Sequence, residues 1–73
     1  NVHGRMVRSA RYKYIRYNTG EPSEQLFDLD QDPGELRNLV LVETARNTLD
    51  EHRRLLNGYI KSTNDNFPLV EVS

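Results

Sequence analysis

The chain has 73 residues, of which 36% are hydrophobic, and a formal net charge of −1. This length allows one small domain, and a lean apolar content gives such a domain only marginal stability. The chain has no cysteine, which excludes disulfides and thiolate metal sites, and its two histidines cannot by themselves close a structural zinc site. It contains no apolar run of membrane-spanning length and no signal-peptide pattern. Because it begins at Asn1 rather than methionine, we expect it to be a processed or excised piece of a longer protein.

Charge is divided unevenly along the chain. Residues 1–20 carry five basic and no acidic side chains, whereas residues 21–73 carry five basic and eleven acidic side chains. This division predicts either an anionic partner for the first segment or pairing between the two halves.

Residues 1–31 are predicted to form a β-hairpin and a third short strand. Residues 6–7 and 12–17 mix aromatic, β-branched and cationic side chains, which is typical of strands. Residues 18–23 contain Gly and Pro and predict a loop, after which residues 25–29 form the third strand.

Residues 32–40 are predicted to form a capped turn. Asp32 stands at the N-cap position, Pro33 at the first helical position and Glu35 at the third, which favours a short helical turn. Leu36 and Leu39 are expected to anchor that turn.

Residues 43–62 are predicted to form one long amphipathic helix, ended by Asn64. With Thr48 and His52, its apolar residues recur at steps of three and four. The predicted apolar stripe is Ala45, Leu49, Leu55, Leu56, Tyr59 and Ile60. The predicted solvent face is Arg46, Asp50, Arg53, Arg54 and Lys61.

Residues 65–73 are expected to be an extended tail whose Phe67, Leu69 and Val70 lie on an apolar surface. A sheet of so few strands needs a covered face. The elements therefore predict an α+β fold, in which a small antiparallel sheet of three to four strands has the long helix packed on one face.

The acidic run at residues 28–32 and His52 are the two features that suggest a metal or catalytic site, and in both cases the surrounding residues favour a structural role. Residues 28–32 spell the D-x-D-x-D opening of a calcium loop, but Pro33 and Leu39 occupy positions that need Gly and Glu. A helix cap explains these acids better. His52 lies within the apolar stripe, which favours a packing role. The sequence has no nucleophile elbow, P-loop or dinucleotide fingerprint, so no motif predicts an active centre.

The basic first segment leaves several interpretations open. Its cations and tyrosines could bind nucleic acid, through phosphates and stacked bases. They could equally bind sulfate or carboxylate groups, which fit the guanidinium fork. A solvated strand face, with arginine stems covering tyrosine rings, explains the same residues without a ligand. A module that dimerises through an apolar surface is a further alternative.

Four segments in order resemble the C-terminal subdomain of the sulfatase family, in its arylsulfatase and heparan-N-sulfatase-like branches. The segments are R-M-V-R-S at 5–9, R-Y-K-Y-I-R-Y at 11–17, Q-L-F-D-L at 25–29 and D-P-G-E-L-R-N-L at 32–39. The family typically has R-x-V-R-T, Y-K-Y-I, E-L-Y-D-L and D-P-x-E-x-x-N-L there, followed by an amphipathic helix. Phe27 stands where tyrosine is usual.

The resemblance implies a small sheet and helix docked on a large α/β catalytic domain, which would lie outside this chain. The family hydrolyses sulfate esters or sulfamates with a formylglycine, made from a C/S-x-P/A-x-R motif, and a divalent cation, usually calcium. That motif is missing here. The resemblance therefore implies no catalytic and no metal-binding residue in this chain, which we expect to be inactive alone and to supply scaffold and cleft edge.

The resemblance also implies partners and residue roles. The expected partners are the absent N-terminal sulfatase domain and a sulfated, anionic glycan, with no nucleic acid and no membrane; the isolated piece is expected to be prone to self-association. The candidate substrate-binding residues are Arg8, Arg11, Lys13 and His3. The candidate structural residues are Asp32, Pro33, Glu35, Asn38 and Leu39. The parent protein is expected in the periplasm, outside the cell or in the lysosome.

Overall fold

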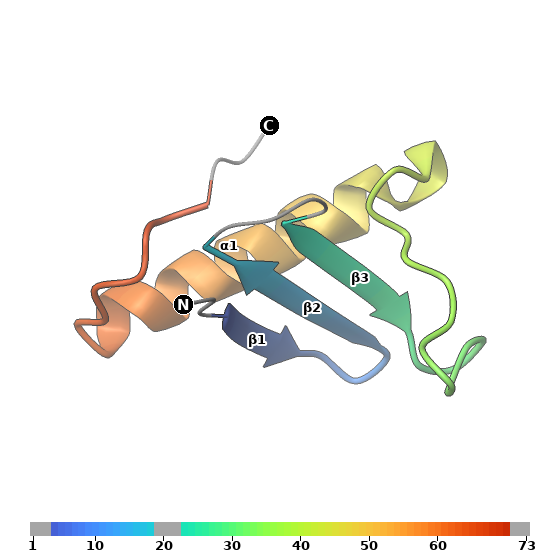
Figure 1. Cartoon of the computed structure of the whole chain (residues 1–73), viewed down its shortest axis with the longest axis horizontal. Helices are drawn as coiled ribbons and strands as arrows, with labels where there is room; N and C mark the ends of the chain where they lie inside the picture. Colours follow the sequence, from blue (N-terminus) through green and yellow to red (C-terminus); the bar gives the residue numbers. More distant parts are fainter. Residues whose placement is uncertain (1–3, 19–22, 71–73) are drawn as a thin grey trace.

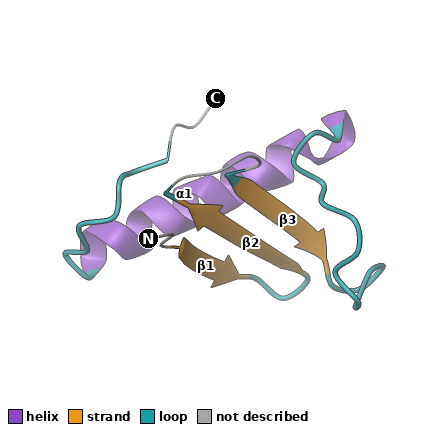
Figure 2. Cartoon of the chain, in the orientation of Figure 1, coloured by secondary structure: helices purple, strands orange, loops and turns teal. Residues whose placement is uncertain are grey.

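The computed structural model describes residues 4–18 and 23–70, which form two layers (Figure 1). Three strands make one antiparallel sheet in the order β1-β2-β3, and a helix lies across one face of it (Figure 2). The elements are β1 (Gly4–Arg8), β2 (Tyr12–Tyr17), β3 (Glu24–Asp28), the 3₁₀ turn η1 (Glu43–Ala45) and α1 (Arg46–Ser62). The predicted α+β class is confirmed, and η1 with α1 covers the predicted helical range. In the described part of the chain, no helix has the length and apolar character needed to cross a membrane.

The β1–β2 hairpin is closed by a short turn. The Ser9 N–H donates to the carbonyl of Tyr12 at 2.9 Å, and the Tyr12 N–H donates to Ser9 Oγ at 3.2 Å. The resulting register places Val7 opposite Tyr14 and Tyr14 opposite Leu26. Because side chains alternate along a strand, these three residues share the face that α1 covers.

The core lies between the sheet and α1, and it is completed by the tail. Its buried members are Tyr14, Leu26, Leu49, Leu56, Ile60, Phe67 and Val70. The Asn57 amide fixes the tail by accepting from the Val70 N–H at 2.7 Å and donating to the Val70 carbonyl at 2.8 Å. The expectation for Phe67 and Val70 is therefore confirmed, whereas Leu69 is half-exposed and points away from the core.

The orientation of α1 differs from the prediction on both sides of its apolar stripe. Leu55 and Tyr59 are each 52% exposed, although the periodicity predicts burial for both. Asp50, predicted on the solvent face, is buried, and Arg53 is mostly buried. A three-stranded sheet is too narrow to cover the whole apolar stripe. The helix instead turns Asp50 and Arg53 inward, where Arg53 forms hydrogen bonds with Asp50 and Glu24. The helix ends at Ser62, and Asn64 stops it as predicted, with a left-handed φ of 56°.

The segment between β3 and η1 contains no helix, so the predicted helical turn is wrong. The Glu35 N–H donates to the Asp32 carbonyl at 3.0 Å, which closes a turn through Pro33. Glu35 then has a left-handed φ of 55°, which a right-handed helix cannot continue. Leu36 is 90% exposed and anchors nothing in the described structure.

Asn38 and the residue after it cover the free edge of β3. Asn38 Oδ1 accepts from the Leu26 N–H at 3.0 Å and from the Val40 N–H at 3.1 Å, while its Nδ2 donates to the Glu24 carbonyl at 3.2 Å. The Leu39 N–H donates to the Leu26 carbonyl at 2.8 Å. The connecting segment thus satisfies backbone groups that an edge strand would otherwise leave unpaired.

Candidate functional site

Most of the positive charge of the first segment is paired within the chain. Four of its five basic side chains contact an acidic side chain from a later part of the sequence. The pairs are Arg5 with Asp65 at 2.6 Å, Arg11 with Asp28 at 2.7 Å, Lys13 with Glu35 at 2.9 Å and Arg16 with Glu24 at 3.7 Å. Of the two explanations for the uneven charge, pairing between the halves therefore accounts for most of it.

Arg11 is held at the turn end of the sheet by a two-pronged ion pair. Its Nε donates to Asp28 Oδ1 at 2.9 Å and its Nη2 donates to Asp28 Oδ2 at 2.7 Å. The Arg11 guanidinium is the main reason why the pKa of Asp28 falls to about 2, and backbone N–H groups of Asp30 and Gln31 add to the effect. The Nε and Nη2 donors of Arg11 are thus both hydrogen-bonded to Asp28 of the same chain.

Among the predicted substrate-binding residues that the structure describes, Arg8 is the one whose side chain forms no ion pair. It lies opposite Lys13 in the register, on the sheet face that points away from α1. Lys13 Nζ donates to Glu35 Oε1 at 2.9 Å, whereas Arg8 is exposed and pairs with no acidic side chain in residues 4–18 and 23–70. His3 lies outside the described residues.

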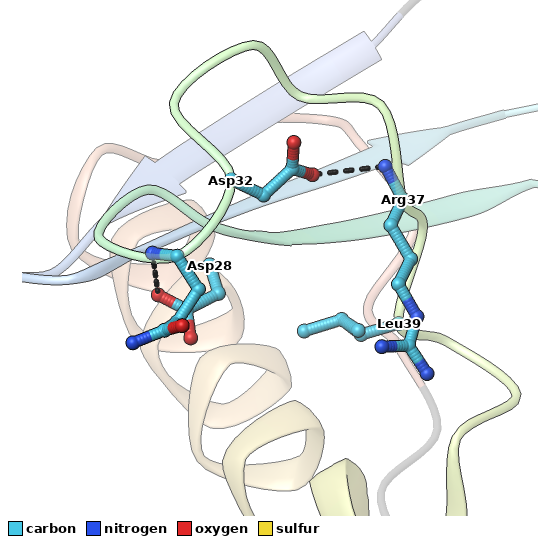
Figure 3. Close-up of a pocket in the computed structure, with 5 residues that line it drawn as sticks. Asp28, Asp32, Arg37 and Leu39 are labelled. Atoms are coloured by element: carbon cyan, nitrogen blue, oxygen red, sulfur yellow. Dashed lines mark hydrogen bonds between the residues drawn. The ribbon is translucent and has the colours of Figure 1, made fainter.

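A hollow of about 340 Å³ lies at the same end of the molecule, lined by Asp28, Gln31, Asp32, Arg37 and Leu39 (Figure 3). The Asp32 carboxylate accepts from the backbone N–H groups of Leu36 at 3.0 Å and Arg37 at 2.8 Å. The Arg37 guanidinium pairs with no acidic side chain in the part of the chain that the structure describes. Sequence reasoning missed this cation, although it lies inside the D-P-G-E-L-R-N-L segment.

The acids around this hollow do not form a metal site. The described ranges contain no group of three or more His, Asp or Glu residues that could hold a metal ion. Asp28 is occupied by Arg11 and by two backbone N–H groups, and Asp32 by two more. These carboxylates stabilise turns, so they do not fit the oxygen cage that calcium requires.

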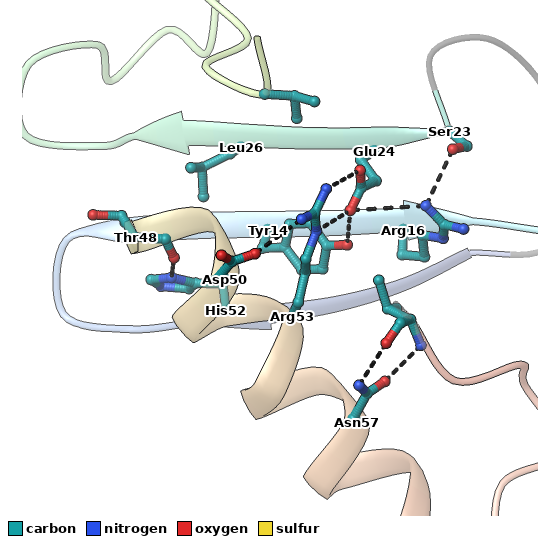
Figure 4. Close-up of polar contacts among 12 residues, drawn as sticks. Tyr14, Arg16, Ser23, Glu24, Leu26, Thr48, Asp50, His52, Arg53 and Asn57 are labelled. Carbon is teal, nitrogen blue, oxygen red and sulfur yellow. Dashed lines mark hydrogen bonds and ion pairs between the residues drawn. The ribbon is translucent and has the colours of Figure 1, made fainter. Parts of the chain in front are cut away.

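A second polar cluster lies in the interior between β3 and α1 (Figure 4). The Tyr14 hydroxyl donates to Glu24 Oε2 at 2.6 Å, and Arg53 donates to both Glu24 oxygens at 2.7 and 2.8 Å. A further N–H of Arg53 donates to Asp50 Oδ1 at 2.9 Å. Burial raises the pKa of Tyr14, and the hydrogen bond from Arg53 lowers the pKa of Glu24.

This interior cluster fixes the helix on the sheet. Among the described residues, every buried side-chain nitrogen and oxygen has a hydrogen-bond partner. A cluster whose polar groups are all satisfied internally offers none of them to a ligand. The cluster could not be predicted from the sequence, because Glu24 and Arg53 are 29 residues apart and because glutamate and arginine usually lie on protein surfaces.

His52 connects α1 to the β1–β2 turn through a hydrogen bond with Ser9. It is 3% exposed, with Nδ1 at 2.7 Å from the Thr48 carbonyl and Nε2 at 2.9 Å from Ser9 Oγ. Because a carbonyl can only accept, Nδ1 carries a proton, and Nε2 can accept from the serine hydroxyl. The Tyr12 ring meets the imidazole edge-on at 5.6 Å. The predicted packing role is thus joined by two hydrogen bonds.

The five candidate structural residues take separate roles in the structure. Asp32 accepts from two backbone N–H groups, and Pro33 occupies the second position of the turn that ends at Glu35. Glu35 pairs with Lys13 instead of capping a helix. Asn38 and Leu39 cover the edge of β3.

The fold defines the class of protein: a small α+β subdomain whose basic hairpin is largely neutralised by acids of the same chain. At the turn end of the sheet, Arg8 and Arg37 have guanidinium groups without an acidic partner among the described residues. Guanidinium groups bind oxyanions such as sulfate, phosphate and carboxylate.

Comparisons with known proteins then identify the relatives of the chain. No protein-family model matches it. It is 44% identical over 69 residues to a Δ4,5-hexuronate-2-O-sulfatase of Bacteroides thetaiotaomicron, which covers 94% of this chain and 14% of that protein. A solved structure of a 2-O GAG sulfatase matches with a TM-score of 0.86 and 40% identity, covering 99% of this chain and 15% of that one. A crystal structure of a candidate sulfatase from Bacteroides thetaiotaomicron matches with a TM-score of 0.82 and 42% identity, over 96% of this chain and 15% of the other.

The chain is therefore a sulfatase subdomain, homologous to a short piece of the Bacteroides 2-O-sulfatases. The resemblance drawn from its sequence segments is confirmed. The chain spans only about 15% of the length of the solved relatives that it matches.

Proposed function

We propose that residues 1–73 are the C-terminal subdomain of a longer sulfatase that removes 2-O-sulfate from uronic acid residues of glycosaminoglycan saccharides. The observation that carries this proposal is the 44% identity to a hexuronate-2-O-sulfatase over 94% of the chain. The similarity of the whole fold to a 2-O GAG sulfatase, with a TM-score of 0.86, supports it.

In this proposal the subdomain supplies scaffold and one edge of the substrate cleft. Arg8 and Arg37 are the residues proposed to attract and orient the sulfated saccharide, because their guanidinium groups have no acidic partner among the described residues. Arg11 and Lys13, which the sequence also nominates, act mainly by holding the turn end of the sheet in place, since Asp28 and Glu35 bind them.

The reaction itself is proposed to take place in the remainder of the protein. The formylglycine and its divalent cation, calcium in the usual case, would be held by the N-terminal domain, so the 73-residue chain alone would be inactive. A sulfatase of this kind is proposed to act outside the cytoplasm, in the periplasm or beyond. The internal pairing of four basic residues disfavours the alternative of a nucleic-acid-binding module.

The test is an assay of the full-length protein on unsaturated uronate disaccharides that carry sulfate at the 2-O or at the 6-O position. We expect release of sulfate from the 2-O-sulfated disaccharide only. Absence of release from both substrates, under conditions that support a known 2-O-sulfatase, would refute the proposed function.

The cleft-edge role is tested separately with R8A and R37A in the same full-length protein. Each is expected to raise KM about two- to fivefold with little change in kcat, the size of a partly exposed charge contact. The matched control is R46A, since Arg46 is an exposed cation at the start of α1, away from the hollow. If R8A and R37A change KM no more than R46A does, the cleft edge lies elsewhere.

A further inference from the structure

The face of α1 that points away from the sheet carries cations without a partner in the fold. Arg54 and Lys61 are exposed, and neither forms an ion pair or a side-chain hydrogen bond within residues 4–18 and 23–70. Asp50, which the sequence predicts on the solvent face, is instead buried and bound by Arg53. Among the acids of α1, all of which the structure describes, Glu51 alone is exposed. The exposed face of the helix is therefore positive.

Gly58 lies between these two cations on the helix surface. It follows Arg54 by four residues and precedes Lys61 by three, and residues at such spacings are neighbours about 5–6 Å apart. The two cations are thus about 10 Å apart along the helix axis, and the position between them has no side chain.

No packing in the described structure requires this glycine. Gly58 is exposed, and a Cβ added to it would meet no neighbouring atom within 4 Å. After proline, glycine is the least favourable residue inside a helix, so Gly58 weakens α1 without a gain in packing. It leaves a bare patch of helix backbone, which a ligand can approach closely.

The end of α1 is satisfied without Lys61. The Tyr59 carbonyl accepts from the Ser62 hydroxyl at 3.1 Å, from the Thr63 hydroxyl at 2.8 Å and from the Thr63 N–H at 3.0 Å. Lys61 therefore contributes its charge to the exposed face and no hydrogen bond to the helix end.

We propose that Arg54, Gly58 and Lys61 form a binding site for one sulfated sugar residue of a glycosaminoglycan chain. The inference rests on the proposed function, because that function makes a sulfated glycosaminoglycan the polyanion that the protein meets. Charge complementarity selects this occupant. The guanidinium group of Arg54 can donate two N–H groups to a sulfate or carboxylate, and the Lys61 ammonium adds a point charge. The sugar ring lies over the bare patch at Gly58.

Equilibrium binding of the full-length protein to an oligosaccharide of 2-O-desulfated heparin tests this site, because removal of 2-O-sulfate cannot consume that ligand. At an ionic strength of about 0.15 M, we expect R54Q and K61Q each to raise Kd about two- to fivefold, and R54Q/K61Q about four- to twentyfold. An unchanged Kd in R54Q/K61Q would overturn the proposal.

The matched control is R46Q. Arg46 is an exposed cation of the same helix, but it lies about 18 Å from Gly58 along the axis, beyond the screening length of about 8 Å. We expect its Kd to stay close to that of the unchanged protein. A loss of affinity in R46Q as large as that in R54Q would show that the whole helix acts as a diffuse charge, without a site at Gly58.

Substitution of Gly58 separates binding from stability. Alanine and leucine both favour a helix over glycine, and the space around Gly58 is open, so neither G58A nor G58L should lower the Tm. The leucine side chain would occupy the bare patch, so we expect G58L to raise Kd about threefold or more relative to G58A. Equal Kd values for G58A and G58L would contradict a sugar ring seated on Gly58.

Two comparisons separate the ligand and the proposed function. An oligonucleotide of equal charge that binds as tightly, and loses affinity in R54Q/K61Q, would overturn the proposal in favour of a nucleic acid. Sulfate release by a protein whose Kd does not respond to R54Q/K61Q would refute this site alone. Binding that depends on Arg54 and Lys61, in a protein that releases no sulfate, would support this site and refute the proposed activity.

Discussion

Replacement of Arg53 by methionine tests whether the interior cluster fixes α1 on the sheet. Arg53 donates to both oxygens of Glu24 and to Asp50, at 2.7, 2.8 and 2.9 Å. The two acids are only 8% and 7% exposed, so R53M leaves Asp50 without its cation, and Glu24 with only the Arg16 contact at 3.7 Å, in a nearly dry site. Removal of one partner of a buried ion pair costs about 3–5 kcal/mol. Methionine keeps most of the side-chain volume, which limits any additional loss of packing.

This loss is large for a domain of 73 residues. Stabilities of about 0.05–0.15 kcal/mol per residue correspond to roughly 4–11 kcal/mol in total for such a chain. Each kcal/mol shifts the Tm of a small domain by roughly 4–8 °C, so R53M should lower the Tm by at least about 12 °C. The measurement is urea and thermal unfolding followed by circular dichroism. The control is R54M, because Arg54 is the exposed neighbour on the same helix.

A double substitution separates lost charge pairing from lost packing. E24Q/R53M removes the Glu24 charge together with its partner, so it should be less destabilised than the two single changes predict when added. The acid dependence gives a second check. The pKa of Glu24 is lowered chiefly by Arg53, so the pair stabilises the fold above the ordinary glutamate pKa and loses this effect as pH falls through the lower folded value. R53M should weaken or reverse that dependence. A free energy of unfolding within about 0.5 kcal/mol of R54M would refute the reasoning.

Three further changes have defined outcomes. N38A removes the hydrogen bonds that cover the β3 edge and should lower the free energy of unfolding by about 1–3 kcal/mol, with faster exchange of the Leu26 amide. N38D keeps the acceptor oxygen and should lower it less. An unchanged Leu26 exchange rate in N38A would argue against this role of Asn38. In an NMR titration the Asp28 carboxyl should have a pKa near 2, and R11Q should raise this pKa toward the ordinary aspartate value near 4. The ion pair stabilises the fold above that ordinary value, and this stabilisation declines as pH falls toward 2. An Asp28 midpoint that R11Q leaves unchanged would contradict Arg11 as the cause of the low pKa. S9A should lower the Tm because the hydroxyl bridges the turn and the buried imidazole of α1, and S9T should restore most of it; equal Tm values for S9A and S9T would show that the hydroxyl contributes nothing.

The order and type of the elements could be predicted from local pattern. Alternation and β-branched or aromatic content identified the strands, and the three- and four-residue spacing identified the helix, with Asn64 as its stop. These features follow from the geometry of a single strand or helix, so neighbouring residues carry the information. The ordered segments between residues 5 and 39 also sufficed to identify the family.

The placement of charge could be decided only by the tertiary structure. The sequence shows a basic segment, but Arg5 meets an acid 60 residues away and Arg16 meets Glu24 across a loop, so their pairing depends on how distant elements pack. The same packing turns Arg53 inward and leaves Arg37 without an acidic partner among the described residues. A guanidinium has the same sequence signature whether it is paired or free, and only the position of its partner in space separates a structural cation from one that can bind a ligand.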